Sequence, residues 1–224
     1  MKKAIAILLS LTMILGLAAC GNSASQTEQP STEDTSVESK ADTNSAENST
    51  DMENTENQDV QDNKVLVAYF SATGTTKGVA EHIANGLNAD IYEIVPEDPY
   101  TDADLNYNDN NSRTTIEMND PNARPAISGS VENMEQYDII FVGYPIWWGE
   151  APRIVSTFME SYDFSGKTIV PFCTSGGSGI GSSASNLERL TSGATWLDGR
   201  RLNGSDSQDT VMEWVNSLDL NLAE

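Results

Sequence analysis

Short apolar runs that alternate with amphipathic helix patterns are the feature that most constrains how this chain can fold. Residues 64–70 and 138–144 are largely apolar runs of strand length, as in strands that are covered on both faces. After each of them, over residues 79–87 and 154–162, apolar side chains recur every three or four positions, as in an amphipathic helix. The same alternation predicts further elements: strands at residues 91–95, 168–172 and 194–197, and helices at 185–190 and 211–218.

Alternation of this kind predicts an α/β fold, in which right-handed crossovers join a parallel sheet that carries helices on both faces. In such sheets a ligand binds beyond the carboxyl ends of the strands, where the strand order reverses. The loops after the first, third and fourth strands are therefore the candidates for a binding site. The connection at residues 96–133 is long and polar, and it indicates only one helix, near residues 105–118.

The amino-terminal residues have the layout of a secretory signal peptide: two lysines, an apolar run over residues 4–17, and small residues before Cys20. The run is too short for a transmembrane helix, which needs about 20 apolar residues to cross a hydrocarbon core of ~30 Å. Residues 17–21 resemble the bacterial lipobox, whose cysteine is acylated and becomes the first residue of the mature protein. We therefore expect residues 1–20 to be a lipoprotein signal peptide with lipid on Cys20. The alternative is an ordinary cleavage site with an incidental cysteine.

Residues 21–63 are polar and acidic, with 11 acidic residues, one basic residue and almost no apolar side chains. Such a segment cannot bury enough apolar surface to offset its ordering entropy, so we expect it to be disordered. It can serve as a tether between a membrane and the following domain, or as a solubilising tail with no length requirement, and the sequence leaves both open. Residues 64–224 remain as one domain, long enough for a single hydrophobic core.

Composition argues against several classes of function. The chain has 34 acidic and 12 basic residues, a formal charge of −22, whereas binding of nucleic acid needs clustered Lys and Arg. One histidine, His82, and two cysteines provide neither a zinc cluster nor a disulfide framework, so we expect no metal site. Cys173 ends a strand and is expected to be a small apolar residue rather than a redox thiol, and His82 is expected at the boundary of a helix face.

The loop after the first strand, residues 71–77, combines hydroxyl side chains, a glycine and a helix start. At such a position free backbone N–H groups and the helix dipole favour an anion. The loop lacks the spacing of nucleoside triphosphate and dinucleotide loops, so a terminal monophosphate is the ligand that it predicts. The alternative is that these residues only cap the helix.

Two tryptophans, Trp147 and Trp148, are adjacent in the loop after the third strand. Neighbouring side chains diverge, so at least one indole should be exposed and able to stack on a flat aromatic ring. The alternative is one anchoring Trp and one incidental surface Trp. The loop after the fourth strand, residues 173–181, is rich in glycine, which allows backbone groups to approach a ligand closely, although a merely flexible loop has the same composition.

Together these loops resemble the flavodoxin-like proteins that bind FMN. Their [ST]-x-T-G-x-T signature is matched at residues 71–76, and residues 143–149, 164–168, 173–179 and 196–199 are similar to the same family. The resemblance implies a doubly wound, five-stranded parallel sheet in the order 2-1-3-4-5, with FMN as the cofactor. It implies that one set of residues binds the FMN phosphate: Ser71, Thr73, Gly74, Thr75 and Thr76. It implies that two sets flank the flavin ring: Pro145, Ile146, Trp147, Trp148 and Gly149 on one side, and Ser175, Gly176, Gly177 and Ser178 on the other.

Many flavodoxins have a second aromatic residue in the loop after the fourth strand, and this chain has none there. The resemblance is therefore closer to the subgroup with a Trp-Trp loop, in which a sandwich of two aromatic residues is not expected.

The expected function is an electron carrier that is lipid-anchored at the outer face of the cytoplasmic membrane and exchanges electrons with redox partner proteins or a small acceptor. The domain has 23 acidic and nine basic residues, a net charge of −14, which disfavours the phosphates of NAD(P)H and favours one-electron transfer over acceptance of a hydride. The alternatives are an FMN-dependent NAD(P)H:quinone-type reductase and a lipoprotein that binds another phosphorylated ligand.

Overall fold

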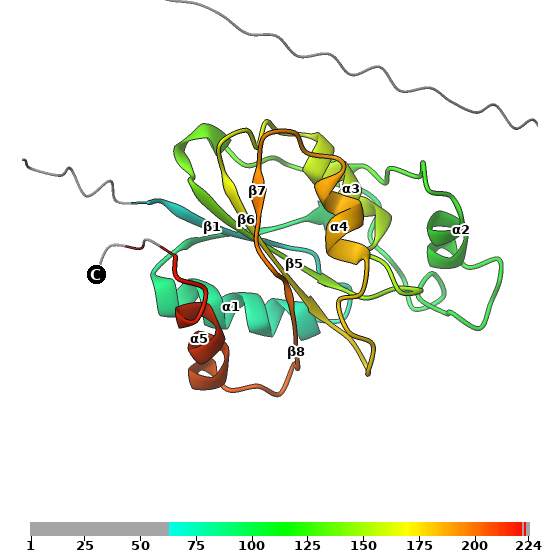
Figure 1. Cartoon of the computed structure of the whole chain (residues 1–224). Helices are drawn as coiled ribbons and strands as arrows, with labels where there is room; N and C mark the ends of the chain where they lie inside the picture. Colours follow the sequence, from blue (N-terminus) through cyan, green and yellow to red (C-terminus); the bar gives the residue numbers. More distant parts are fainter. Residues whose placement is uncertain (1–62, 221, 223–224) are drawn as a thin grey trace, which may run out of the picture. The chain divides into compact units, whose positions relative to one another are not determined.

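A parallel β-sheet is the centre of the computed structural model, which describes residues 63–220 and 222 (Figure 1). All of its neighbouring strands are parallel. The strands follow one another in the order β2 (Asp90–Glu93), β1 (Val65–Tyr69), β5 (Ile139–Pro145), β6 (Thr168–Thr174) and β7 (Thr195–Trp196), and β8 (Arg200–Leu202) also pairs with β6. This confirms the expected order 2-1-3-4-5, with the fifth position divided between β7 and β8.

Side-chain alternation along β1 explains why the sheet needs cover on both faces. Leu66, Ala68 and Phe70 contribute to one hydrophobic core, while Val65 and Val67 contribute to another. Successive side chains of a strand point to opposite faces, so a continuous apolar run is stable only where both faces are buried. All five residues of β1 are buried, as the sequence predicts.

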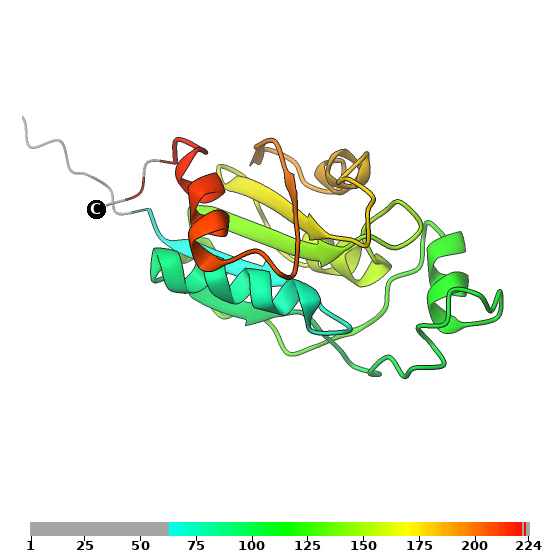
Figure 2. The same cartoon turned by 90° about the horizontal axis from the view of Figure 1, so that it is seen from below.

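Helices cover both faces of the sheet. Helices α1 (Thr75–Leu87) and α5 (Gln208–Asn216) pack on one face, side by side in Figure 2, and α3 (Arg153–Glu160) and α4 (Ser183–Glu188) pack on the other. The expected arrangement of these four helices is confirmed, and each agrees with its observed bounds to within a few residues.

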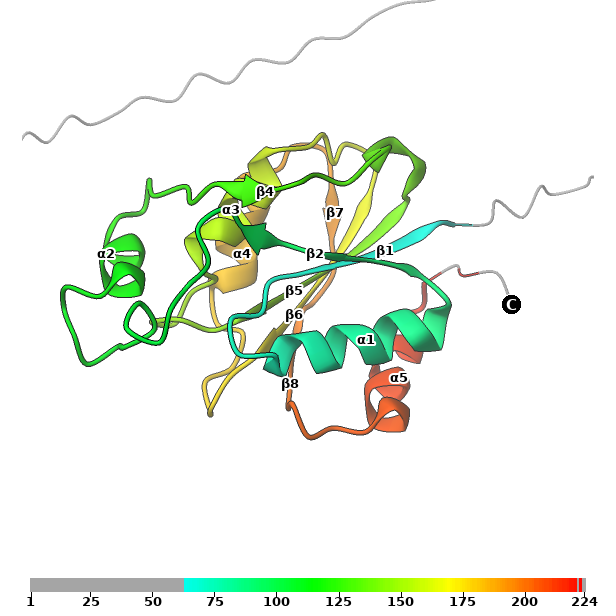
Figure 3. The same cartoon turned by 180° about the vertical axis from the view of Figure 1, so that it is seen from behind.

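The connection at residues 96–133 differs from its expectation. The predicted strand at 91–95 is divided: Ile94 turns into the core after β2, and β3 (Val95–Pro96) pairs antiparallel with β4 (Ile127–Ser128). The helix expected near residues 105–118 is only α2 (Arg113–Asn119), followed later by the short η1 (Met134–Gln136). Figure 3 shows α2 beyond the carboxyl ends of β1 and β5.

Local side-chain hydrogen bonds explain why α2 starts so late. Asp104 accepts hydrogen bonds from the backbone N–H and the hydroxyl of Thr101, at 2.8 and 2.6 Å, so this stretch is held as a turn. The Ser112 side chain then accepts a bond from the Thr115 N–H and caps the helix. Such bonds compete with helix formation before the cap.

Among the described residues no helix is long and apolar enough to cross a membrane. The predicted signal peptide, residues 1–20, lies outside the described residues, as does the predicted tether except for Asn63. Lipidation of Cys20 therefore stays a prediction.

Candidate functional site

The three predicted loops meet at the carboxyl edge of the sheet. The hydroxyls of Thr76 and Thr174 share a buried hydrogen bond of 2.8 Å, which joins the loop after β1 to the end of β6. The N–H of Ile146 donates to the carbonyl of Thr174 at 2.9 Å, which joins the loop after β5 to the same point. The structure thus brings together three segments that lie up to 100 residues apart in the sequence.

The loop after β1 presents exposed hydroxyls at a helix N-terminus. Gly74 is the N-cap of α1 with φ of 83°, a left-handed conformation that glycine adopts without steric cost. Thr73 and Thr75 on either side of it are exposed, and their hydroxyl oxygens lie 3.4 Å apart. A Cβ added at Gly74 would meet no atom within 4 Å, so the space in front of the backbone is open. Ser71 is half-buried at the base of the loop.

Thr76 differs from the other residues expected to bind phosphate, because its side chain is only 1% exposed and is bonded to Thr174. It therefore faces the interior, while Thr73 and Thr75 face outward. The sequence contains the signal for this difference: Thr76 precedes Val79 and Ala80 by three and four residues, so it belongs to the buried stripe of α1.

The loop after β5 is a tight turn that carries Trp148 in a strained conformation. Trp147 and Glu150 exchange two backbone hydrogen bonds, of 2.9 and 3.0 Å, around Trp148 and Gly149. The φ angles of Trp148 and Gly149 are 49° and 82°, as in a type I′ turn. A bulky L-residue pays of order 1 kcal/mol or more for this conformation, and such strain is concentrated at functional positions.

The two tryptophans occupy different environments. Trp147 is 9% exposed, and its ring lies edge-on to those of Phe70 and Tyr100, with centroid distances of 5.5 and 5.4 Å. Trp148 is 45% exposed. One indole is therefore an anchor in the core and the other is available for stacking on a ligand. Pro145 and Ile146 are half-buried below this turn.

The loop after β6 is also a closed turn. The Ser175 hydroxyl donates to the carbonyl of Ser178 and accepts from the N–H of Gly177 at 3.3 Å. Gly176 and Gly177 are exposed, and a Cβ at either position would meet nothing within 4 Å. A ligand can therefore approach this backbone directly.

Glu150 joins the turn of the tryptophans to the start of α4. Its carboxylate accepts from the Ser182 hydroxyl at 3.0 Å and from the Asn186 side-chain amide at 2.8 Å. The turn of the tryptophans is thereby fixed to α4.

Sequence reasoning missed two aromatic residues of this site, Tyr100 and Tyr107. The Tyr107 side chain is 69% exposed, and its ring centroid lies 6.0 Å from that of Trp148 at an interplanar angle of 71°. These are the only aromatic residues of the polar connection at 96–133, and that contrast is the signal that could have identified them. A second exposed aromatic ring therefore lies beside Trp148, although it does not come from the loop after β6.

Cys173 and His82 take the positions expected of them. Cys173 is fully buried, and burial raises the pKa of its thiol to about 12, so the thiolate required for redox chemistry is scarce at neutral pH. His82 is half-buried at the edge of the apolar face of α1.

Known proteins with a similar sequence and fold indicate the family of this chain. No curated protein matches the chain. A protein from Bacteroides eggerthii designated a flavoprotein is 48% identical, with a TM-score of 0.66 over 70% of this chain and 98% of that one. A similarly designated protein from Bacteroides uniformis is 46% identical, with a TM-score of 0.66 over 70% and 99%. A Lactobacillus acidophilus flavoprotein in complex with FMN is 21% identical, with a TM-score of 0.54 over 70% and 99%.

The family model for flavodoxin matches residues 64–218, which include every strand of the described residues, all three loops and the whole of α5. Since this match spans more than half of the sequence, the chain belongs to the flavodoxin family.

Proposed function

We propose that the domain binds FMN at the three loops and acts as an electron carrier. The observation that carries this proposal is the pairing, at one edge of the sheet, of an open hydroxyl-lined helix N-terminus with an exposed indole held in a strained turn. FMN has a terminal phosphate and a flat ring system, which match these two features. The complex of the Lactobacillus acidophilus flavoprotein with FMN supports the assignment.

The groups at the phosphate end fit an anion that is held by hydrogen bonds rather than by a dedicated cation. Thr73 and Thr75 offer hydroxyls, and the first N–H groups of α1 have no partner within the helix. Lys77 lies 4.0 Å from the carboxylates of both Glu81 and Glu93, so its charge is already shared.

The groups at the ring end fit a flat aromatic ligand. Trp148 and Tyr107 present exposed rings, and Gly149, Gly176 and Gly177 leave open space in front of their backbone. Bound FMN would supply the ability to accept and release electrons, while the residues of this chain bind it, orient it and set the electric field around it.

Charge favours a carrier that donates electrons at low potential. The domain has a net charge of −14. One carboxylate at ~10 Å in a water-like dielectric disfavours an added negative charge by about 0.4 kcal/mol before screening, or roughly 20 mV for one electron. Several acidic residues near the flavin would lower its potential by several tens of millivolts.

Titration with FMN tests this proposal directly. FMN fluorescence should be quenched by the protein with a stoichiometry of one per chain, because an indole or phenol stacked on the ring quenches its emission. Riboflavin, which lacks the phosphate, should bind more weakly and serves as the matched ligand. A protein that leaves the emission of FMN unchanged at micromolar concentrations has a different ligand.

Steady-state assays distinguish the carrier from an FMN-dependent NAD(P)H:quinone-type reductase. We expect the purified protein with FMN bound to oxidise NADH and NADPH only slowly unless a separate reductase is added, because its negative surface repels their phosphates. Fast and saturable NAD(P)H oxidation by the protein alone would favour the reductase.

The strained turn predicts that Trp148→Gly will change stability and binding in opposite directions. Glycine adopts positive φ without steric cost, so the free energy of unfolding should rise by about 1 kcal/mol. Flavin binding should weaken by about 1 kcal/mol, the value of one aromatic stacking contact. Urea denaturation and FMN titration measure the two effects, and a variant that is neither more stable nor weaker in binding would contradict this role.

For the full chain we propose attachment by lipid on Cys20 to the extracytoplasmic side of the cell membrane. The lipobox at residues 17–21 supports this location. The partners would then be redox proteins or small electron acceptors at that surface.

A further inference from the structure

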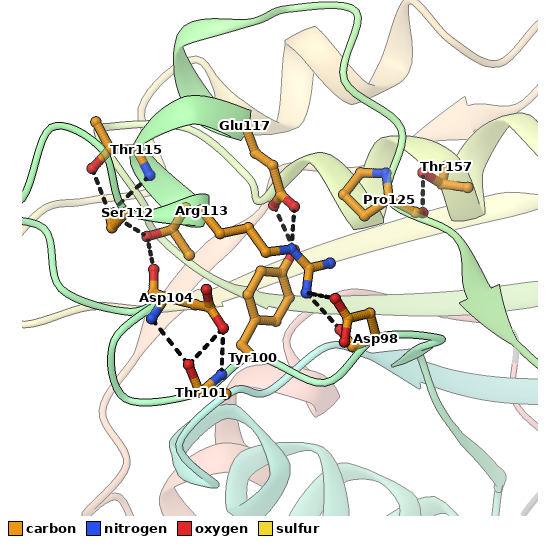
Figure 4. A network of polar contacts seen from close by, with 11 residues as sticks. Asp98, Tyr100, Thr101, Asp104, Ser112, Arg113, Thr115, Glu117, Pro125 and Thr157 are labelled. Atoms are coloured by element: carbon orange, nitrogen blue, oxygen red, sulfur yellow. Dashed lines mark hydrogen bonds and ion pairs between the residues drawn. The ribbon is translucent and has the colours of Figure 1, made fainter.

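A cluster of polar and aromatic side chains lies in the connection at residues 96–133, whose role the sequence did not reveal (Figure 4). It consists of Asp98, Tyr100, Arg113 and Glu117, and we call it the Arg113 cluster. The guanidinium of Arg113 lies over the ring of Tyr100, 4.2 Å from its centroid. Its Nε donates to Glu117 Oε1 at 2.7 Å, and its Nη1 donates to the carbonyl of Asp98 at 2.6 Å.

The members of the Arg113 cluster hold one another in a fixed geometry. The Tyr100 hydroxyl donates to Glu117 Oε2 at 2.6 Å, so the two oxygens of one carboxylate fix both the arginine and the tyrosine. Asp98 adds an ion pair of 3.4 Å to the arginine. Arg113 and Glu117 are half-buried, which makes their pair less screened by solvent than a surface pair, whereas Asp98 is exposed.

The Tyr100 ring connects the Arg113 cluster to the candidate site by packing contacts. Its centroid lies 5.4 Å from that of Trp147 and 5.8 Å from that of Phe70, and the latter two rings are 5.5 Å apart, so the three form a closed triangle of edge contacts. Trp147 begins the turn that presents Trp148. Phe70 is the residue directly before the loop that presents Thr73 and Thr75.

The other end of α2 is held by α3. Arg153 donates to the carbonyls of Met118 and Glu117, at 2.9 and 3.4 Å, and so satisfies the carboxyl end of the short helix. A different ion pair fastens the same connection farther along α3: Arg124 makes two bonds to Glu160, of 2.7 and 2.8 Å. Neither member of that second pair takes part in the aromatic contacts, so it provides a matched control.

We propose that Tyr100, Arg113 and Glu117 are positioning residues for the ring-binding side of the site. The turn at Trp148 is strained, and such a conformation persists only where its surroundings fix it. Trp147 supplies one fixed end of that turn, and the Arg113 cluster holds Trp147. The same connection places Tyr107 beside Trp148. This inference rests on the proposed FMN site. It means that residues outside the three loops help to fix the conformation of that site.

The test compares FMN and riboflavin binding by Tyr100→Ala, Tyr100→Phe, Glu117→Gln and the control Glu160→Gln. Tyr100→Ala removes two aromatic contacts, so it should weaken both ligands alike, by about tenfold. Tyr100→Phe keeps the ring and should recover most of the loss. Glu117→Gln should weaken both ligands by a smaller factor, and Glu160→Gln should leave both unchanged. Urea denaturation of Glu117→Gln and Glu160→Gln separates an effect on the site from a general loss of folding.

A second readout needs no flavin. The indole N–H resonances of Trp147 and Trp148 in the NMR spectrum of the free protein should shift in Glu117→Gln and Tyr100→Phe, whereas those of Trp196 and Trp214 should not. If the parent protein binds no flavin but these shifts appear, the proposed function fails while the Arg113 cluster still positions the turn. Unchanged resonances of Trp147 and Trp148 would overturn the positioning role, as would flavin affinities in Glu117→Gln that equal those of Glu160→Gln.

Discussion

Replacing Thr73 and Thr75 together by alanine is expected to weaken FMN binding severely while leaving riboflavin binding unchanged. A hydrogen bond to a charged group contributes about 1.5–3 kcal/mol, so two lost hydroxyls should reduce the affinity by about two to four orders of magnitude. Both side chains are exposed beside Gly74 and their hydroxyl oxygens are 3.4 Å apart, so one phosphate can accept from both. Fluorescence titrations with the two ligands measure the effect.

Thr76→Val is the matched control from the same loop. Its hydroxyl is buried against that of Thr174, so the isosteric substitution should reduce the free energy of unfolding by about 1–3 kcal/mol through an unpaired hydroxyl. The affinity of the folded protein for FMN should change little. If the double alanine variant binds FMN as tightly as the parent protein, or if only Thr76→Val weakens it, the outward hydroxyls merely shape the turn.

The sheet could be predicted from the sequence because its strands are buried on both faces. A run such as Val65–Tyr69 has no amphipathic alternative and is long enough to recognise by itself. The fifth strand position of the sheet was only partly predicted. Its two strands, β7 and β8, have three residues or fewer and are fixed by pairing with β6, which local sequence does not reveal.

The connection at residues 96–133 could not be predicted because its order comes from distant partners. Helix α2 has seven residues, and Ile116 on it is exposed, so it has no apolar stripe. It is held by Tyr100, which bonds to Glu117 and packs on Trp147, and by Arg153, which bonds to the carbonyls of Glu117 and Met118. Tertiary contacts of this kind override weak local propensity.

Within the candidate site, the sequence located the loops but not the orientation of each side chain. The motif at residues 71–76 contains three similar threonines, and the fold buries only Thr76. Adjacent tryptophans had to diverge, but only the structure shows that Trp147 is the anchor and Trp148 the exposed ring. In both cases the outcome depends on which position faces the core, and the motif alone does not encode that; for Thr76 the apolar stripe of α1 does.

Cys20→Ser is expected to abolish lipid attachment to the full chain. If residues 17–21 are a lipobox, Cys20 is the acylated residue. One acyl chain alone binds a membrane only marginally, so stable anchoring needs two or more acyl chains on this cysteine. Metabolic labelling with palmitate and fractionation of membranes should show complete loss of label, together with either release of the protein or an uncleaved precursor.

Cys173→Ala is the control, since these two residues are the only cysteines of the chain. Cys173 is fully buried and the pKa of its thiol is raised to about 12, so it is neither accessible to acylation nor appreciably ionised at neutral pH. This variant should keep its label and its place in the membrane fraction. Label that persists in Cys20→Ser, or that disappears in Cys173→Ala, would contradict the assignment. Unchanged processing of Cys20→Ser would indicate an ordinary cleavage site, and residues 21–63 would then be a solubilising tail rather than a membrane tether.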